Sequence, residues 1–520
     1  MAEEDLIFGK NRHFFGGIEP SNMLAFSVAV ETGVVKVTAT LPNDTVVNDQ
    51  TLCTVEGAII RRKTTDYPKD EFDGDLVANI KASTVFNDSG ASPTGTNYYA
   101  AFPYTTQGVY NRNKANRASI AQKKGDYLFG YDLFNTVYQP TYRVKYPSDV
   151  DNAKFTKAAM NFRTGEFDYG GWAFDPGEKF MPRPCMLTYD GKVDHYLNPN
   201  DYTKKVDGTE SKVTDTSFDG NAMMEWPKIY TKRWESDGVY HFRCSDTPQD
   251  DTWDCWCNYD RNNNQIDQFY TPIYFGSLDT SQKLRSISCS DNSVNLLPDE
   301  EITYAKANGN DWYTEVLADR LLLQDLLVMM AGSTDCQAAF GNGRAIASNK
   351  DAIISGTMDT KGMFWGSTDR RLGVKVFGME NVWGNLSRYI AGWIVDCGTQ
   401  KVKLTRGTHD GSTVTDYNTD GSGYKTIANA TPVGDYGGYI SNMKTEAFGR
   451  LPVIANGSST TFETDIMWYN EIECCYALVG GAYNDDDVAI GPFYADVQHG
   501  LYESDSLFGA ALSCKPLATA

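Results

Sequence analysis

The segment GGAYNDDDVAIGPFY at residues 480–494 places three consecutive carboxylates between a glycine pair and an aromatic stretch. Carboxylate oxygens are ligands that Ca²⁺ prefers, so Asp485, Asp486 and Asp487 are candidates for a calcium site. Three adjacent side chains cannot all face one ion, however. An exposed acidic loop is therefore the favoured interpretation, calcium is the alternative, and we expect neither a bound metal nor another cofactor.

A second acidic stretch begins at Asp260 and imitates the start of an EF-hand. Gln265 stands where such a loop needs glycine, and Thr271 stands where it needs a bidentate glutamate. An Asx-rich turn between strands is favoured.

The spacing of the cysteines and histidines gives little support for a zinc site. The eleven cysteines are scattered, and the close sets Cys255-Trp-Cys257 and Cys474-Cys475 lack the spacing of a zinc knuckle. The five histidines lie far apart in the chain. An odd number of cysteines without scaffold spacing predicts reduced and mostly buried thiols.

Two tryptophans among carboxylates, Trp253 and Trp256 in DDTWDCWCNYD, have the composition of a sugar-binding cleft. The same residues alternate as a half-buried strand would, and packing is the favoured interpretation. Glycosidase chemistry needs two carboxylates held across a cleft, and no pair stands out in so acidic a chain.

Composition restricts the class of protein. The 520 residues are 41% hydrophobic and 13% aromatic, enough to fill the cores of two to four domains. A net charge of -21 disfavours nucleic-acid and anionic-membrane partners. The start, MAEEDLIFGK, lacks the features of a secretory signal, and no stretch is long enough to cross a bilayer, so we expect synthesis in a cytoplasm without membrane insertion.

Short strand patterns fill residues 34–104, separated by turn signals such as Asp73-Gly74. The runs are VVKVTATLP, EGAIIRRK, DGDLVANI, STVFNDSG and TNYYAAFPY. They predict an all-β module over about residues 23–110, preceded by an N-terminal segment at 1–22.

This module resembles the fibronectin type III modules of bacteriophage and prophage structural proteins. The resemblance rests on Ile60–Lys63, Tyr67-Pro68, Asp73-Gly74 and the Tyr98-Tyr99 pair that leads into Phe-Pro-Tyr. Ala39 stands where such modules usually have a core tryptophan. The resemblance implies a β-sandwich of immunoglobulin-like type, with residues 1–22 as an attachment segment.

Residues 111–154 are rich in basic side chains, which predicts a solvated linker or one short helix. Residues 155–520 have long loops, many glycines and one convincing helix, WYTEVLADRLLLQDLLVMMAG, which has a broad apolar face and a stop at Gly332. We therefore expect an α+β domain with a short, heavily decorated sheet.

Three segments of this domain look, in order, like the C-type lectin fold in its formylglycine-generating, sulfatase-modifying branch. They are KVFGMENVWGNLSRYIAGWIV at 375–395, MKTEAFGRLP at 443–452, and the closing segment at 476–515. The pattern implies that Trp383 and Trp393 fill the core, that Gly384 allows a tight turn, and that Asn381 and Asn385 close loops by hydrogen bonds.

Enzymes of that branch carry a redox-active cysteine pair just after the Gly-Gly turn. Here Gly480 and Gly481 are followed by no cysteine before Cys514, so the resemblance implies that this chain is not such an enzyme.

The other use of the fold is in phage tropism determinants, whose closing segment displays changing residues, often written by a diversity-generating retroelement, on a fixed frame. The frame here would be Gly480-Gly481 and Gly491-Pro492-Phe493. The resemblance implies these ligand-binding residues: Tyr483, Asn484, Asp485, Asp486, Asp487, Tyr494, Asp496, Gln498, His499, Tyr502, Glu503, Ser504 and Asp505.

We therefore expect a bacteriophage virion protein of the tail- or head-fibre type that recognises a host-surface protein or glycan. Tyrosine supplies stiff contact area, polar side chains supply adaptable hydrogen bonds, and many copies on one particle raise the avidity. One alternative is a structural decoration or spacer that binds other virion proteins, and another is an enzyme acting on host polysaccharide. Related tropism determinants are homotrimers, although no heptad pattern enforces that state here.

Overall fold

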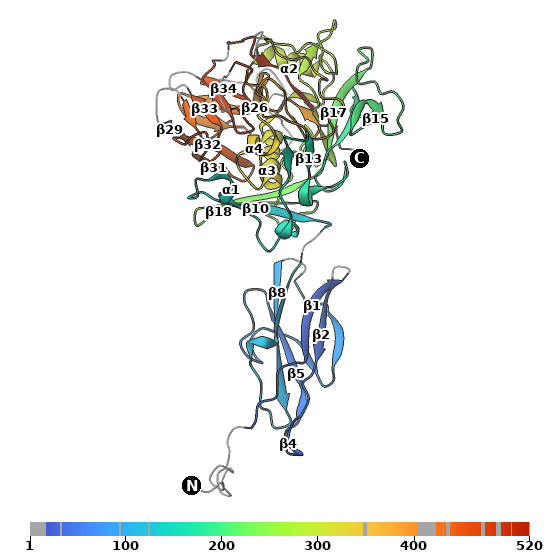
Figure 1. Ribbon diagram of the computed structural model, residues 1–520, viewed down its shortest axis with the longest axis vertical. Helices are drawn as coiled ribbons and strands as arrows, with labels where there is room; N and C mark the ends of the chain where they lie inside the picture. Colours follow the sequence, from blue (N-terminus) through green and yellow to red (C-terminus); the bar gives the residue numbers. More distant parts are fainter. Residues whose placement is uncertain are drawn as a thin grey trace. The chain divides into compact units, whose positions relative to one another are not determined.

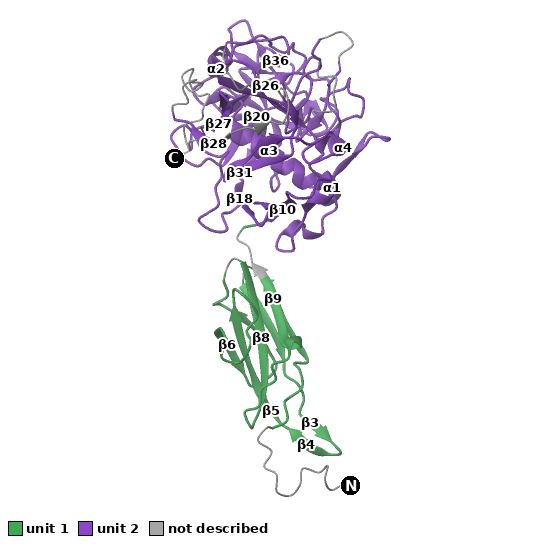
Figure 2. Ribbon diagram, turned by 90° about the vertical axis from the view of Figure 1, so that its left-hand side faces the viewer, with its two compact units in different colours: residues 1–125 green, residues 126–520 purple. Residues whose placement is uncertain are grey.

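The computed structural model describes residues 17–31, 34–92, 95–122, 125–346, 351–403, 423–429, 431–432, 437–469, 474–484, 490–500 and 502–518. The chain divides into two compact units, residues 1–125 and 126–520 (Figure 2). Most of the regular structure in both units is β-strand (Figure 1). Among the described residues, none of the helices has the length and apolar character needed to traverse a bilayer.

Unit 1 is built from two antiparallel sheets whose side chains share one core. Val35 and Val37 from one sheet pack with Ile60, Tyr99 and Ala101 from the other. The three-stranded sheet has the order β1 (Ala25–Glu31), β2 (Val34–Thr40), β7 (Thr84–Asp88), and the four-stranded sheet has the order β6 (Asp75–Ile80), β5 (Val55–Lys63), β8 (Gly95–Thr105), β9 (Arg117–Gln122). A hairpin of β3 (Thr45–Val47) and β4 (Gln50–Cys53) completes the unit.

All five predicted strand runs of unit 1 are strands, because their alternation matches the sandwich. In β2 the alternate side chains of Val35, Val37 and Ala39 are fully buried while their neighbours are not. Ala39 therefore lies in the core, at the position where the resemblance expects a larger side chain.

The predicted linker at residues 111–154 is not a linker. Its first part forms β9, which pairs with β8, and its later part forms β10 (Leu128–Phe134), α1 (Pro140–Arg143) and β11 (Val144–Lys145). β9 is an edge strand, and an edge strand tolerates charged side chains on its open side. The basic composition of this stretch therefore did not indicate a strand. β10 pairs along its whole length with a strand about a hundred residues later, a partner that no local pattern reveals. The boundary lies at residues 125–126 rather than 154–155.

Unit 2 is organised around three larger sheets. The four-stranded sheet has the order β11, β10, β19 (Val239–Ser245), β18 (Tyr230–Ser236). The seven-stranded sheet has the order β16 (Asp201–Lys205), β15 (Val193–Asn198), β14 (Arg183–Thr188), β17 (Gly220–Pro227), β20 (Gln268–Pro272), β37 (Leu512–Cys514), β23 (Trp312–Thr314). The eight-stranded sheet has the order β28 (Lys425–Asn429), β27 (Thr399–Val402), β26 (Ser387–Asp396), β34 (Cys474–Val479), β35 (Ala495–Val497), β33 (Ile466–Tyr469), β30 (Gly437–Tyr439), with β36 (Phe508–Gly509) parallel to β26.

Unit 2 also contains smaller sheets and short helices. The small sheets pair β12 (Ala159–Asn161) with β13 (Glu166–Asp168), β21 (Gly276–Leu278) with β22 (Leu284–Ser286), β24 (Lys375–Val376) with β25 (Met379–Glu380), and β32 (Gly449–Ala455) with both β29 (Thr431–Pro432) and β31 (Asn442–Glu446). The short helices are α2 (Pro298–Lys306) and α4 (Cys336–Phe340).

The longest helix of the described residues is the predicted one. α3 (Leu317–Ala331) ends at Gly332, which adopts the left-handed conformation with φ 54°. The prediction of one broad apolar face understates its burial, because every residue except Gln324 is buried. α3 is thus a core helix, enclosed by elements that include α4, β26 and β32.

Asp325 on α3 is the centre of a buried polar cluster. Its carboxylate accepts hydrogen bonds from the Tyr131 hydroxyl at 2.7 Å, the Tyr240 hydroxyl at 2.9 Å and Arg233 Nε at 2.7 Å. Burial and the Asp325 charge raise the pKa of both phenols, so both stay protonated as donors. These donors come from β10, β19 and β18, so one carboxylate fastens α3 to the four-stranded sheet.

We predict that Asp325→Asn destabilises unit 2 by about 3–5 kcal/mol, because the buried Arg233 loses its only counter-charge within this cluster. All ten tryptophans lie in unit 2, so the midpoint of denaturant unfolding followed by tryptophan fluorescence reports on this unit. The matched control is Asp237→Asn in the exposed β18–β19 turn, which should change stability by less than about 0.5 kcal/mol. Equal midpoints for the two variants would contradict the assigned role.

Candidate functional site

The Gly-Gly part of the predicted frame is tied to the loop that precedes β26. Gly480 and Gly481 both have positive φ, 88° and 76°, a conformation that glycine adopts at little cost. The Gly384 N–H donates to the Gly480 carbonyl at 2.9 Å, and the Tyr483 N–H donates to the Asn385 carbonyl at 3.1 Å. Two segments about a hundred residues apart are thus joined at the turn after β34.

Most of the roles predicted for the 375–395 segment are confirmed. Trp383 and Trp393 are buried, and Gly384 has φ 74° with so little space that a Cβ would lie 2.5 Å from the Arg344 backbone nitrogen. The Asn385 side chain accepts from the Ile353 N–H at 2.9 Å and donates to the Ile353 carbonyl at 3.2 Å.

Asn381 contributes differently from the prediction. Its backbone has φ 52° and its N–H donates to the Val374 carbonyl at 2.6 Å. Its side-chain oxygen is buried and has no hydrogen-bond partner among the described residues. Asn381 therefore closes the loop through its backbone rather than its side chain.

The Gly-Pro-Phe part of the frame is held by buried polar side chains. The Pro492 carbonyl accepts from Arg320 Nη2 at 2.9 Å and from Gln324 Nε2 at 2.8 Å, both on α3. The Phe493 N–H donates to Asp465 at 2.8 Å, and a Cβ on Gly491 would lie 2.3 Å from the same carboxylate. Only glycine fits there, so the frame is rigid for steric and electrostatic reasons.

Burial also shifts the titration of these anchors. It lowers the pKa of Arg320 to about 10 and raises the pKa of Asp465 well above its usual value. Arg320 Nη1 also donates to the Val382 carbonyl at 2.9 Å, so one guanidinium joins the Gly-Pro-Phe part of the frame to the 375–395 segment.

The structure divides the predicted binding residues into buried and exposed sets. Asp485, Asp486 and Asp487 lie outside the described residues. Tyr483, Tyr494 and Asp496 are buried, and Gln498 and His499 are half-buried. The exposed ones are Asn484, Tyr502, Glu503, Ser504 and Asp505, and the last four form the closing loop.

The two buried tyrosines among the predicted binding residues pack against apolar side chains in the interior. Tyr483 packs with Phe275 and Leu386, and Tyr494 packs with Ala345 and Ile490. In the described part of this segment, of the predicted binding residues only Asn484 and the closing loop are exposed, while Tyr483 and Tyr494 are packed in the interior.

His499 connects two other predicted residues, Asp496 and Glu503. Its Nε2 lies 3.2 Å from Asp496 and its Nδ1 lies 2.9 Å from Glu503. Burial disfavours the imidazolium, but the two carboxylates outweigh it and raise the pKa of His499 to about 9. At neutral pH a charged His499 thus links the end of β35 to the closing loop.

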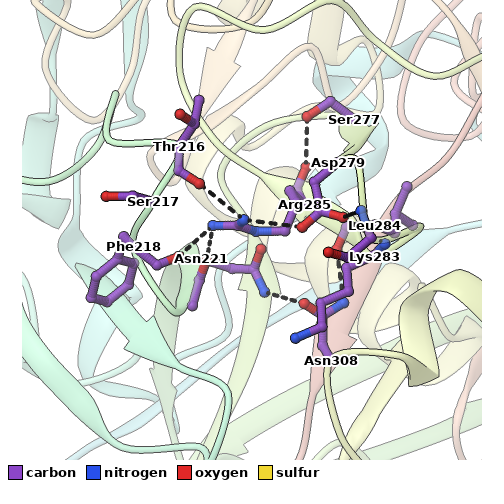
Figure 3. A network of polar contacts seen from close by, with 12 residues as sticks. Thr216, Ser217, Phe218, Asn221, Ser277, Asp279, Lys283, Leu284, Arg285 and Asn308 are labelled. Atoms are coloured by element: carbon purple, nitrogen blue, oxygen red, sulfur yellow. Dashed lines mark hydrogen bonds and ion pairs between the residues drawn. The ribbon is translucent and has the colours of Figure 1, made fainter.

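A polar pocket of about 590 Å³ lies elsewhere in unit 2, and no motif indicated it. We call it the Arg285 pocket (Figure 3). Its walls come from four separate stretches: Tyr189 after β14, residues 216–219, the β21–β22 hairpin, and residues 287–291. Each stretch alone has the composition of an ordinary polar loop, so only folding reveals the pocket.

Arg285 holds the walls of this pocket together. Its Nη2 donates to the carbonyls of Phe218 and Gly220 at 2.7 Å each, and its Nη1 lies 3.4 Å from Asp279 (Figure 3). The side chain is almost completely buried. Loop 216–220 and the β21–β22 hairpin are thereby fixed to one another.

Backbone hydrogen bonds join the Arg285 pocket to the closing segment. The Gly276 N–H, at the base of the β21–β22 hairpin, donates to the Ala510 carbonyl at 2.8 Å. The Asn295 N–H, just beyond loop 287–291, donates to the Asp505 carbonyl at 3.2 Å. The pocket and the closing loop therefore belong to one continuous hydrogen-bonded region.

The other sequence candidates are structural. Asp260 accepts from the N–H groups of Asn262 and Asn264 at 2.9 Å each, which confirms the Asx-rich turn. The predicted half-buried strand at 250–260 is wrong: the segment is a series of turns with isolated bridges, and both Cys255 and Cys257 are buried. Alternation cannot distinguish a strand from a loop that is covered on both sides.

The thiols behave as predicted. All eleven cysteines are free, and most are buried. Within the described ranges no three His, Cys, Asp or Glu side chains are grouped so that they could hold a metal ion.

Comparison with known proteins does not identify the chain. No family model matches the sequence, and no curated protein matches it. The assignment of function therefore depends on the residues and their geometry.

We predict that His499 titrates near pH 9 in NMR spectra and that Glu503→Gln lowers this pKa. A raised pKa means that the folded state binds the proton more tightly, so the stabilisation is complete below about pH 6.5 and is lost as the pH rises through 9. The stability difference between the wild type and His499→Gln, at most about 3 kcal/mol, should shrink over that interval. An ordinary pKa for His499 would contradict the bridge.

Proposed function

We propose that this chain is a receptor-binding protein of a bacteriophage virion, of the tail- or head-fibre type, which recognises a host-surface ligand with the closing segment of unit 2. It acts by binding and not by catalysis. The observation that carries this proposal is the closing loop, in which Tyr502 is 89% exposed and is followed by exposed Glu503, Ser504 and Asp505.

The chemistry of the loop suits recognition. A tyrosine whose ring lies in water gains apolar burial when a partner covers it, and its hydroxyl keeps a polar handle for hydrogen bonding. The neighbouring carboxylates and hydroxyl offer adaptable hydrogen bonds. This is the composition of a binding surface rather than of a core.

The backbone of the loop is ordered before any ligand arrives. The Tyr389 hydroxyl donates to the Glu503 carbonyl at 2.7 Å, and the Ser387 N–H donates to the Leu507 carbonyl at 2.9 Å. With the Asn295–Asp505 bond and the His499–Glu503 pair, these contacts fix the loop at several points. Binding then costs little conformational entropy.

Within this proposal unit 1 is a fibronectin type III-like module and unit 2 a C-type lectin-like domain. Three-stranded and four-stranded sheets around one core support the first assignment. Support for the second comes from the contacts that join the 375–395 segment to the closing segment, and from the pairing of β26 with β34.

Unit 1 has features that suit attachment to other virion proteins. Phe72 is 76% exposed and Leu76 is 58% exposed. Exposed apolar side chains gain free energy when a partner protein removes them from water. The same observation favours the second candidate function, a decoration or spacer protein that binds only its virion neighbours.

We predict that Tyr502→Ser weakens binding of the full-length chain to bacterial cells by at least about tenfold, as expected for an aromatic hot spot. Fluorescently labelled chain would be titrated against a panel of bacterial isolates, and cell-bound fluorescence measured. The matched control is Tyr142→Ser, since Tyr142 on α1 is also a strongly exposed tyrosine.

Two outcomes would contradict receptor binding through this loop. One is equal binding of the Tyr502 and Tyr142 variants to cells. The other is a chain that binds purified virion particles but no cell surface, which would establish the decoration role.

A further inference from the structure

We propose that the Arg285 pocket is a binding site for a neutral saccharide. Its volume of about 590 Å³ falls within the roughly 300–1,000 Å³ typical of small-molecule sites. The inference goes beyond the proposed function, because none of the residues that line the pocket belongs to the closing loop.

The pocket combines groups that are already satisfied with groups that are free. Asp279 is satisfied: it accepts from the N–H groups of Ser281 and Lys283. It also pairs with Arg285 (Figure 3). Asp219 and Asp291, by contrast, are exposed and make no side-chain hydrogen bond within the part of the chain that the structure describes. The same holds for the hydroxyls of Thr216, Thr280 and Ser281.

These free groups define the chemistry of the ligand. Ionised carboxylates only accept hydrogen bonds, whereas serine and threonine hydroxyls both donate and accept. A ligand that satisfies them all must itself carry several groups that donate and accept at close spacing. Sugar hydroxyls do so, and hydrogen bonds to a charged carboxylate are among the stronger ones.

Other classes of ligand fit less well. Asp219, Asp279 and Asp291 outnumber the two cations of the lining, Lys283 and Arg285, and Arg285 is already occupied by protein carbonyls and Asp279, so an anion is disfavoured. For a metal ion, the described residues offer no cluster of three His, Cys, Asp or Glu ligands. An apolar ligand would leave the carboxylates and hydroxyls without partners, which is costly on burial.

Tyr189 forms an aromatic wall of the pocket, and the Lys283 ammonium lies over its ring. Its ring is half-buried, and Lys283 Nζ lies 3.9 Å from the ring centroid. This contact holds the Lys283 ammonium at the pocket, where it can donate hydrogen bonds, whereas the carboxylates accept them. Because Arg285 fixes the walls beforehand, a saccharide would meet a preorganised site.

The test is saturation-transfer-difference NMR on the full chain with the methyl glycosides of glucose, galactose, mannose, N-acetylglucosamine and N-acetylgalactosamine. At least one of these should receive saturation, and titration should then give its Kd. Glucose 6-phosphate and N-acetylneuraminic acid serve as anionic comparisons and should bind more weakly than the neutral sugar.

The double variant Asp219→Ala/Asp291→Ala should weaken binding by at least about tenfold, because it removes two charged acceptors. Both side chains are exposed and unpaired among the described residues, so folding should be unaffected. The matched control, Asp237→Ala/Asp251→Ala, removes two exposed aspartates outside the pocket and should leave the Kd unchanged. Thr280→Trp should block the pocket by its bulk without changing its charge.

Three results would overturn the proposal: no saturation of any neutral sugar, a Kd that neither Asp219→Ala/Asp291→Ala nor Thr280→Trp changes, or tighter binding of an anionic sugar than of the neutral ones.

This test can fail or succeed independently of the test of the proposed function. Tyr502→Ser should keep its affinity for the sugar, so loss of cell binding in that variant and loss of sugar binding in the pocket variants report on different sites.

Discussion

The three hydrogen bonds that Asp325 accepts are the constraint around which unit 2 is arranged. A helix buried on all sides cannot leave a carboxylate unpaired, because an isolated buried charge costs far more than one interaction returns. α3 carries three buried charged side chains. Asp325 contacts the four-stranded sheet, whereas Asp319 and Arg320 both contact the closing segment, Asp319 through Lys515 at 2.7 Å and Arg320 through the Pro492 carbonyl. The position of α3 is therefore specified by charge pairing as well as by apolar packing.

The same helix also holds part of the closing segment. Arg320 and Gln324 hold the Pro492 carbonyl, Asp465 holds the next residue, and the loop that displays Tyr502 is fixed by hydrogen bonds on both sides. The Arg285 pocket follows the same logic, with one buried guanidinium holding two walls. In both places a buried guanidinium donates to backbone carbonyls of the walls it holds, while the exposed side chains in the described residues include groups without a partner. That division suits recognition, because the scaffold does not have to reorganise when a ligand binds.

The sequence allowed a good prediction wherever a local pattern decides the structure. The periodicity of apolar residues predicts α3 and five strands of unit 1. The sequence also predicts the tight turn at Gly384 and the core position of Trp383. Interactions between segments that are distant in the chain could not be predicted from local sequence patterns. β10 is defined by its pairing with β19, and the domain boundary moved because of it. Tyr483 and Tyr494 have the composition of a binding surface but lie inside, since composition does not report which side of a loop is covered. The Arg285 pocket needs four stretches at once, so no single stretch could indicate it.

The most direct test of recognition by unit 2 is hydrogen–deuterium exchange of the full chain with and without envelope fragments from bacteria that bind it. The proposed function predicts slower exchange at residues 502–505, with no change in α3, which is buried already. Protection confined to unit 1, or no protection in either unit despite measurable binding, would contradict it.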